Sequence, residues 1–528
     1  ILAPGASETV NITVDKSELR TYDANNAKTY IVDAGDYYFT AATDAHNAVN
    51  NILAAKGYTV ENTDGRMTAD GDVALTYKWT NAALDSTTYA TSETGTAITN
   101  LFDEADPNKS SSEPGEVTWL SRSNWVATFP TQPVVLNATQ TLADHLAFTR
   151  YDGSKADSVE MPTLGADNGL ALVSMIGADY DDPQWDTLLD QLTFNEMVNT
   201  ITLGFHNTAA IESIGKTRTK DENGPQGLTA ALTGGASAMC YTSEDVMAAT
   251  FNVDLINDVG RCIGEDCLAM GYSGLYGPGI NMHRTAYSGR NFEYYASDPF
   301  VAGTICAAEV NGIQSKGVYV YLKHVALNDS ESSRRGVNTW LNEQAAREIY
   351  LEVADKAVTD GGAWSVMSGF NRWGAYWCGA YDNLLTGFLR GELGMRGMII
   401  TDYSGSSKYM DLADGLIAGS DIWDSPDPTI HTTLAPKYEN DAYIVTEMRE
   451  SMHKILYTVA NSNAMNGWSS ADRLKVITPW WKTALYALDT VLAVLTVLCI
   501  WRLVVAIKRK KTWTAEQAAN TANAQNQQ

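Results

Sequence analysis

Between about residue 185 and residue 460 the chain alternates short apolar runs with longer amphipathic patterns, and this alternation restricts the fold more than any other feature. The apolar runs have the character of strands and are GLYGPGIN (274–281), GVYVYLKHVAL (317–327), WSVMSGF (364–370) and MIITDY (398–403). The amphipathic pattern NEQAAREIYLEVADKAV (342–358) has one apolar helical face, formed by Tyr350, Val353, Ala354, Ala357 and Val358. Strands that alternate with such helices predict a parallel sheet with crossover helices.

The length of this region favours one parallel architecture over another. It is close to the ~250 residues typical of a (β/α)₈ barrel, so we predict a TIM-like barrel over residues 185–460. A doubly wound open sheet is the alternative, but GYSGLYG (271–277) lacks the spacing of a dinucleotide-binding glycine loop. In the pattern WDTLLDQLTFNEMVN (185–199), which predicts a helix, Thr193 and Glu196 have the spacing of a capping box.

Residues 1–60 have the alternation of half-buried strands. Val10, Ile12 and Val14 share one face of TVNITV, and a second run, TYIVDAGDYYFTAA, covers 29–42. A hairpin alone is only marginally stable, so we predict part of a β-sandwich here. Residues 61–184 are predicted to be a linker and insertion region, in which FDEADPNKSSSEPG (102–115) forms an exposed loop.

The carboxyl-terminal part contains an almost wholly apolar run, 484–507, which approximates the ~20 residues that a membrane-spanning helix needs. Trp480 and Trp481 precede this run, and a basic cluster at 508–511 follows it. We therefore predict a juxtamembrane segment at 461–483, one transmembrane helix at 484–507 and a cytoplasmic tail at 508–528. The positive charges after the helix predict a single-pass cell-membrane protein whose catalytic domain is extracellular. A buried core helix is the alternative.

Two further expectations come from the amino terminus and the composition. The chain begins with Ile1 and has no signal-peptide pattern at its start, which favours an amino-terminal truncation. The formal net charge of −26 over 528 residues predicts a surface that repels phosphate backbones, so nucleic acid is not expected as a partner. No pattern indicates a metal or nucleotide cofactor, and none is expected.

Polar residues just after the predicted strands are the candidates for the active site, because barrel enzymes build their sites at the carboxyl ends of the strands. Carboxylates, cations and amides at such positions suit a sugar pocket. These residues are Asp402 and Tyr403, Lys323 and His324, Ser368 and Asn371, His283 and Arg284, and, in the next loop, Arg290, Asn291 and Glu293. Asp421 and Asp424, by contrast, are interpreted as loop structure.

Four long motifs in this region resemble glycoside hydrolase family 3 in order and spacing. They are LYGPGINMHRTAYSGRNFEYYASDPFVAG, KHVALNDSES, VMSGFNRW and GMIITDY, and the likeness covers about residues 185–425. The amino-terminal strings TVDKSELRTYD and AGDYYFTAATDAHNAVNNIL are similar to the fibronectin-type-III-like domain of the same family. That domain precedes the barrel in family members with inverted domain order.

The resemblance implies a role for each matching residue. Asp402 corresponds to the nucleophile that forms a glycosyl-enzyme intermediate, and the nearby cations would keep it ionised. Residues that correspond to the first sugar subsite are Arg290, Lys323, His324 and Met367. The chain departs from the family at Asn223, which replaces an aspartate, at Tyr403, which replaces a tryptophan, and at Phe370, which replaces a tyrosine. Asp221 and Glu222 are candidates to compensate for Asn223.

A retaining glycosidase also needs a general acid about 5–5.5 Å from the nucleophile. No residue of the predicted barrel matches the family's acid, which in many members comes from a separate α/β domain, and we expect it from a region before residue 1. The resemblance implies retaining hydrolysis of a β-glucoside or an oligosaccharide. The alternatives are a glycan-binding cell-surface protein whose catalytic function has lapsed, and a glycoside phosphorylase on the same scaffold.

Overall fold

The computed structural model describes residues 2–110, 116–121, 124–135, 137–146, 150–230, 232–405, 407–427, 429–475 and 477–526. The chain divides into two compact units, one up to Asp472 and one from Arg473 onward.

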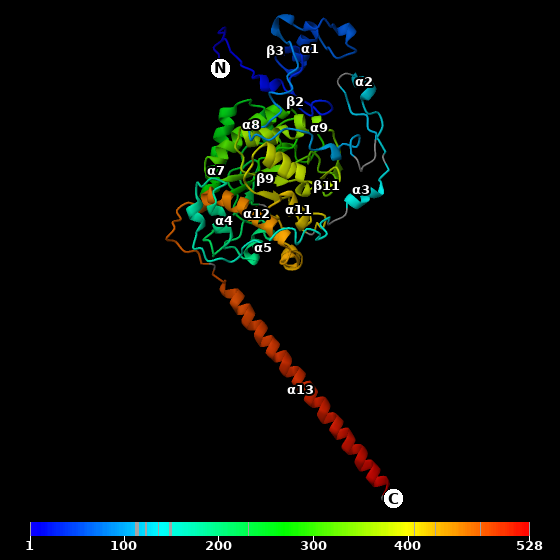
Figure 1. The fold of residues 1–528 in the computed structure, drawn as a ribbon, viewed down its shortest axis with the longest axis vertical. Coiled ribbons are helices and arrows are strands. Elements are labelled where there is room, and N and C mark those ends of the chain that lie inside the picture. Colours follow the sequence, from blue (N-terminus) through cyan, green and yellow to red (C-terminus); the bar gives the residue numbers. More distant parts are fainter. Residues whose placement is uncertain are drawn as a thin grey trace. The chain divides into compact units, whose positions relative to one another are not determined.

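The first unit is built on a five-stranded parallel sheet, near the centre of the unit in Figure 1. Its strands are β5 (Asp221–Asn223), β6 (Gly274–Tyr276), β7 (Tyr319–Val325), β9 (Ser365–Ser368) and β12 (Ile399–Thr401). The spatial order β12-β9-β7-β6-β5 follows the order in the chain without a reversal. A doubly wound sheet would reverse at a switch point, so that alternative is excluded. The four predicted strand runs are confirmed.

Helices connect successive strands or follow the last one, and they cover the outside of the sheet. They are α6 (Glu244–Ala248), α7 (Val253–Met270), α8 (Pro299–Gln314), α9 (Glu343–Ala345), η8 (Ala346–Tyr350), α10 (Glu352–Thr359), η10 (Asn383–Glu392), α11 (Leu412–Ala418) and α12 (Ala442–Ala460). Val320 and Leu322 of β7 pack in one apolar cluster with α7 and α8, whereas Tyr319 and Tyr321 belong to a second cluster. This alternation is the two-residue period of a strand, and it directs Lys323 to the same side as Tyr321.

The predicted eight-stranded barrel is not confirmed, because the regular strands form only about half of a ring. Irregular backbone lies between the two edges of the sheet. Ile422 pairs with Ile400 of β12, the Trp423 N–H donates to the Ile201 carbonyl at 2.7 Å, and the Asp221 N–H of β5 donates to the His206 carbonyl at 3.0 Å. The positive φ of 52° at His206 is incompatible with an extended strand, which explains why this sector is irregular.

The amino-terminal residues form two separate ladders instead of a sandwich. Strand β1 (Thr21–Asp23) pairs with β2 (Thr29–Ile31), and β3 (Gly35–Thr40) pairs with β4 (Thr76–Asn81), both antiparallel. Helix α1 (Ala45–Ala55) packs beside β3. The second predicted strand run is confirmed, but residues 9–14 are exposed and unpaired within the described structure. In the described part of 2–81, neither ladder faces a second sheet, so the fibronectin-type-III-like domain is not confirmed.

Shorter elements complete the first unit. A small sheet consists of β8 (Asn338–Thr339), β10 (Arg372–Trp373) and β11 (Tyr376–Trp377). The helix predicted over 185–199 is two helices, α4 (Gln184–Leu189) and α5 (Phe194–Thr202). The predicted capping box is confirmed, since Thr193 Oγ1 accepts from the Glu196 N–H at 3.2 Å and the Glu196 carboxylate accepts from the Thr193 N–H at 2.9 Å. The remaining short helices include α2 (Trp125–Thr128) and α3 (Gln140–His145).

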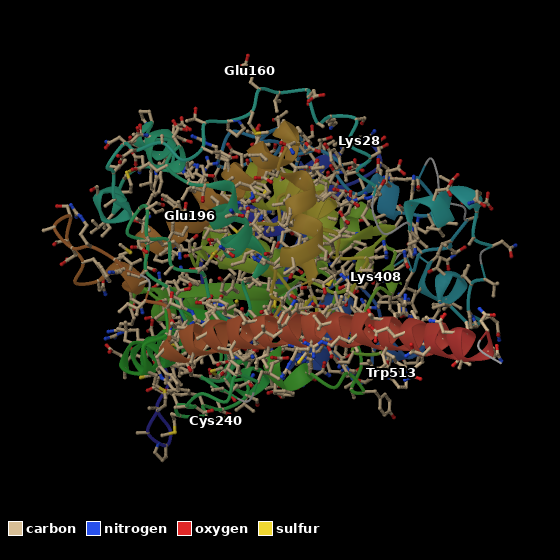
Figure 2. All side chains as sticks on the ribbon, turned by 90° about the horizontal axis from the view of Figure 1, so that it is seen from below. Lys28, Glu160, Glu196, Cys240, Lys408 and Trp513 are labelled. Carbon is tan, nitrogen blue, oxygen red and sulfur yellow. The ribbon has the colours of Figure 1, made fainter. Side chains whose placement is uncertain are left out.

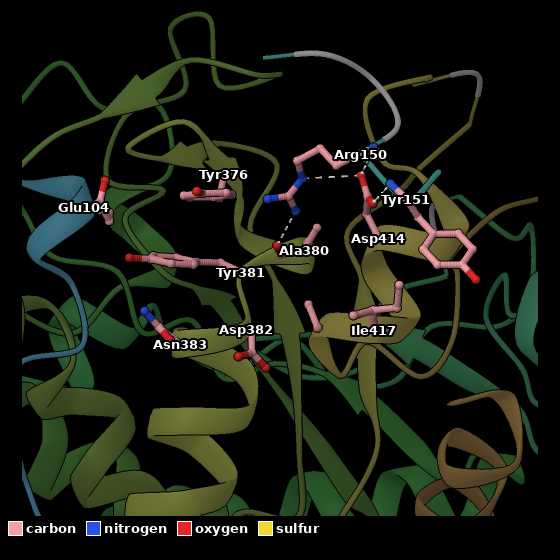
Figure 3. Close-up of a pocket in the computed structure, with 11 residues that line it drawn as sticks. Glu104, Arg150, Tyr151, Tyr376, Ala380, Tyr381, Asp382, Asn383, Asp414 and Ile417 are labelled. Atoms are coloured by element: carbon pink, nitrogen blue, oxygen red, sulfur yellow. Dashed lines mark hydrogen bonds and ion pairs between the residues drawn. The ribbon is translucent and has the colours of Figure 1, made fainter. Parts of the chain in front are cut away.

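One part of the insertion region, at Arg150 and Tyr151, is attached to α11 through Asp414. Its carboxylate accepts the backbone N–H groups of Arg150 at 2.8 Å and Tyr151 at 2.9 Å. The Arg150 guanidinium also donates to the Ala380 carbonyl at 2.8 Å (Figure 3). These residues line a cavity of about 380 Å³ whose other walls include Tyr376 and Tyr381.

Replacing Asp414 with alanine should destabilise this attachment, because two partly buried backbone hydrogen bonds would lose their acceptor. We expect a loss of about 1–3 kcal/mol in the free energy of unfolding, measured by urea denaturation. Asp382 lines the same cavity but makes no helix-cap hydrogen bond, so Asp382→Ala is the matched control. Equal stability of the two variants would contradict this assignment.

The second unit is dominated by α13 (Trp480–Gln525), a helix of 46 residues. Its most apolar window has a mean hydropathy of 2.5, and none of that window is buried. Figure 2 shows side chains along the whole length of the helix, including Trp513. By length and composition the helix is sufficient to cross a membrane. Helical structure continues to Gln525, so most of the predicted tail is an extension of the same helix.

Candidate active site

A cavity of about 580 Å³ lies where the parallel strands end. Eight of the residues singled out from the sequence line it: Asn223, Arg290, Lys323, His324, Met367, Phe370, Asp402 and Tyr403. Six other candidates do not line it: His283, Arg284, Asn291, Glu293, Ser368 and Asn371. The eight lining residues come from β5, from the loop after β6, from β7, from β9 and the residues just after it, and from the end of β12. Residues distant in the chain therefore share one hollow, as expected for the carboxyl edge of a curled parallel sheet.

Asp402 immediately follows β12 and is 7% exposed. Its Oδ2 lies 3.2 Å from Arg334 Nη1 and 3.5 Å from His324 Nε2, and its Oδ1 accepts the Tyr403 N–H at 2.7 Å. Burial raises the pKa of Asp402 above its usual value, although Arg334, Arg290 and Lys323 act in the opposite direction. The cations lower the pKa of Asp402, as the sequence analysis expected, but burial raises this pKa by more than the cations lower it.

His324 is a neutral imidazole held in one orientation by Asn281. The Asn281 amide nitrogen donates to the His324 backbone carbonyl at 3.0 Å, and the Asn281 amide oxygen accepts the His324 backbone N–H at 3.0 Å. The same oxygen lies 3.2 Å from the ring nitrogen Nδ1 of His324. Burial, followed by Arg290, Lys323 and Arg334, holds the pKa of His324 well below its usual value. Nδ1 therefore carries the proton, and Nε2 accepts from Arg290 Nη1 at 3.1 Å.

Arg290 and Lys323 converge on the same carboxylate, Glu293. Arg290 forms a close ion pair with Glu293 and lies 3.6 Å from Glu331, and Lys323 Nζ lies 3.5 Å from Glu293 Oε2. Burial lowers the pKa of Lys323, with Glu293 opposing that shift. The partner carboxylates balance most of this positive charge, so the two donors are fixed in position beside Asp402.

Strand β7 explains why two consecutive residues, Lys323 and His324, both line the cavity. Alternation alone would direct neighbouring side chains to opposite faces. The register with β9 shifts between Lys323 and Val325, and such an irregularity re-aims a side chain. The local sequence contains no sign of this shift.

Several cavity residues were missed by the sequence analysis. They are Phe205, His206, Leu232, Tyr276, Arg334, Arg335, Asp424 and Pro426. The Arg-Arg pair at 334–335 directly after KHVALNDSESS was a usable signal, because a basic pair in a strand-end loop suits ligand contact. Asp424, which was interpreted as loop structure, lies outside regular secondary structure and is 3% exposed in the cavity wall. Asp421 is structural, with Arg390 at 2.6 Å and Lys454 at 3.6 Å.

Asp221 and Glu222 do not compensate for Asn223, because neither lines the cavity. Asp221 accepts the hydroxyls of Tyr319 at 2.6 Å and Tyr321 at 3.3 Å beneath the floor. Glu222 lies 3.1 Å from His206 Nδ1 and is also bonded by Thr233. Among the described residues, no group of three or more His, Cys, Asp or Glu side chains is arranged to hold a metal ion.

Comparison with known proteins finds similarity over the region that contains the parallel sheet. Residues 205–430 match the model of the glycosyl hydrolase family 3 N terminal domain. A β-glucosidase of Rhizobium radiobacter is 34% identical over 240 residues, which cover 45% of this chain and 29% of that protein. The thermostable β-glucosidase B of Acetivibrio thermocellus is 32% identical over 244 residues, which cover 44% of this chain and 32% of that protein.

A solved β-glucosidase from Paenibacillus barengoltzii has the same fold over a longer stretch. It superposes with a TM-score of 0.61 at 20% identity, covering 87% of this chain and 48% of that one. The chain thus spans about a third of the two curated relatives and about half of this solved protein.

Proposed function

The chain belongs to glycoside hydrolase family 3, and we propose that it hydrolyses β-glycosidic bonds of the β-glucoside type with Asp402 as the nucleophile. One observation carries this proposal: a buried carboxylate at the end of β12 contacts Arg334 and His324 in a hollow that suits a sugar ring. Attack by Asp402 on the anomeric carbon forms a glycosyl-enzyme ester and divides one displacement into two easier steps.

The other cavity residues are proposed to bind and orient the sugar. Arg290 and Lys323 donate hydrogen bonds to sugar hydroxyls, and neutral His324 contributes a ring nitrogen beside Asp402. Met367 supplies an apolar contact, and Tyr403 covers the rim, where it is 36% exposed. Asn223 makes a neutral hydrogen bond where the family has a charged one, so we expect weaker recognition of that hydroxyl.

An activated aryl β-glucoside with a dinitrophenolate leaving group provides the direct test, because its cleavage needs little protonation of the leaving oxygen. Release of the phenolate and of free glucose, with no acceleration by phosphate, supports hydrolysis. Dependence on phosphate would instead indicate a phosphorylase. Sugar binding without any turnover would contradict the proposal and leave a glycan-binding protein.

Removing Arg334 should shift the acidic limb of the pH profile. Arg334 stabilises the ionised form of Asp402, so its loss raises the pKa of Asp402 further. In Arg334→Met the acidic limb of kcat/KM therefore moves to higher pH, whereas Arg261→Met on the exposed side of α7 leaves it unchanged. An unchanged limb in Arg334→Met would contradict the assigned contact.

We also propose that α13 anchors the protein in a cell membrane with the catalytic unit on the extracellular side. Its unburied apolar window and the basic residues 508–511 support this proposal. Flotation of the chain with liposomes, lost when residues 480–526 are deleted, is the expected result. Retention of binding after the deletion would contradict an anchor at this helix.

A further inference from the structure

The wall of the cavity changes character between its inner part and its mouth. The inner part is buried and polar, since Lys323, His324 and Asp402 are no more than 7% exposed. The apolar lining residues that reach solvent are Phe205, Leu232, Tyr403 and Pro426. Asp402 would attack the anomeric carbon in the inner part, so the group on the other side of the glycosidic bond, the aglycone, would lie toward the mouth.

The mouth suits an aromatic aglycone better than a second sugar. Leu232 is 70% exposed and Tyr403 is 36% exposed. The rings of Phe205 and Tyr403 meet edge to face, with centroids 6.0 Å apart. Among these side chains and that of Pro426, only the Tyr403 side chain carries a hydrogen-bonding group, whereas a sugar ring needs several partners for its hydroxyls. A flat apolar ring would cover this surface without leaving hydroxyl groups unpaired.

Arg335 lies at this mouth, beside the strand end that carries Tyr403. It is exposed, lines the cavity and has its guanidinium carbon 5.2 Å from the ring centre of Phe370. Ser368 of β9 pairs with Thr401 of β12, and Phe370 and Tyr403 each follow that pair by two residues. Adjacent strands are about 4.8 Å apart, so Arg335 stacks at the strand end next to Tyr403.

Arg335 differs from the other cations of the cavity wall in having no carboxylate partner. Arg290, Lys323 and Arg334 each lie within 3.6 Å of a carboxylate oxygen. In the described part of the chain Arg335 has the ring contact with Phe370 but no ion pair. The chain as a whole has a formal net charge of −26, so an unbalanced guanidinium at the mouth is a local site for an anion.

We propose that the cavity selects β-glucosides whose aglycone is an aromatic ring bearing a carboxylate, and that Arg335 binds this carboxylate. The proposal rests on the hydrolytic function proposed above. A guanidinium presents two parallel N–H donors to a carboxylate, and stacking on Phe370 restricts the plane in which these donors lie. The aromatic ring of the aglycone packs against the apolar mouth. Arg335 thereby determines specificity and takes no part in bond breaking.

Two analogues that resist cleavage measure the contribution of the carboxylate, 4-carboxyphenyl 1-thio-β-glucoside and its 4-carbamoylphenyl counterpart. Sulfur replaces the leaving oxygen, so titration calorimetry measures binding without turnover. The two ligands have nearly the same shape, and only the first is charged at pH 7. The full chain should bind the carboxylate about tenfold more tightly than the carboxamide, and Arg335→Met should reduce this ratio to about one.

Arg396→Met is the matched control. Arg396 is also exposed, has its guanidinium carbon 5.1 Å from the ring centre of Tyr180, and has no ion pair in the part of the chain that the structure describes. It precedes β12 and therefore lies at the amino end of the sheet, away from the cavity. Its replacement should keep the tenfold ratio. Added salt should lower the ratio in the unmodified chain, because it screens an exposed charge pair.

A second pair of ligands tests the aromatic part of the proposal. Phenyl 1-thio-β-glucoside should bind more tightly than 4-thiocellobiose, whose second ring is a sugar, because the mouth offers an apolar surface and few hydrogen-bonding groups. Both ligands are neutral, so this comparison does not depend on Arg335. Tighter binding of 4-thiocellobiose would overturn the aromatic aglycone.

The results separate this proposal from the hydrolytic one. A ratio near one in the unmodified chain, or a ratio that survives Arg335→Met, would overturn the role of Arg335. Turnover of the dinitrophenyl glucoside alongside such a result would leave hydrolysis standing. A tenfold ratio that is lost in Arg335→Met, without any turnover, would instead contradict hydrolysis and leave a selective binding site.

Discussion

Asp402→Asn is expected to lower kcat/KM for an activated aryl β-glucoside by at least about 10⁴-fold. Asparagine has the shape of aspartate but a neutral amide cannot form the glycosyl ester. The activated leaving group makes the nucleophile the group on which cleavage depends most. The loss should therefore appear in kcat and kcat/KM together, measured by phenolate release.

The control for this variant is Asp258→Asn. Asp258 is on the outer side of α7 and pairs only with Arg261 in the described ion pairs, and both side chains are more than half exposed. Its replacement should leave kcat/KM within about twofold, because exposed ion pairs contribute little. Activity of Asp402→Asn close to that of this control would contradict the nucleophile assignment.

Arg347→Met is expected to cost about 3–5 kcal/mol of folding free energy, because it leaves buried carboxylates without their cation. Arg347 is 1% exposed. It contacts Glu343 at 2.7 Å, both oxygens of Glu392 at 2.7 and 2.9 Å, and the Thr99 carbonyl at 2.8 Å. The ring of Tyr22 lies 4.6 Å from its guanidinium carbon. One residue thus connects the amino-terminal segment to two crossover helices.

Urea denaturation measures this cost, with Arg261→Met as the matched control. The Arg261 side chain is 55% exposed and forms one ion pair among the described residues, with Asp258. Replacing Arg261 should therefore change the free energy of unfolding by no more than about 0.5 kcal/mol. Similar midpoints for the two variants would show that the buried network does not stabilise the fold.

The sequence contains enough information for the central sheet and for much of the cavity wall. Apolar runs bounded by glycine and polar residues mark β6, β7, β9 and β12, because a strand buried on both faces needs such a run. Side chains near or just after the carboxyl ends of these strands line the cavity, which is why Asp402, Lys323 and Met367 could be placed from spacing and motif.

Other features depend on contacts between distant segments. The closure of the ring relies on Gly204, where a Cβ would lie 2.3 Å from Ile422, and a single glycine in a sequence does not reveal such an approach. Arg334 contacts Asp402 although the two residues are 68 positions apart in the chain. Asp424 lies in the cavity wall only because its segment pairs with β12. Residues 9–14 have a strand pattern, but in the described structure they have no partner strand, and pattern alone cannot supply one.

The most direct test of the central claim is to trap the glycosyl-enzyme ester and locate it. The unmodified chain would be incubated with dinitrophenyl 2-deoxy-2-fluoro-β-glucoside. Its fluorine slows both formation and hydrolysis of the ester, but the activated leaving group keeps formation fast, so the ester accumulates. Mass spectrometry of the digested protein should then find one fluoroglucosyl group, attached to Asp402. Absence of the label, or a label on any other carboxylate, would contradict the account.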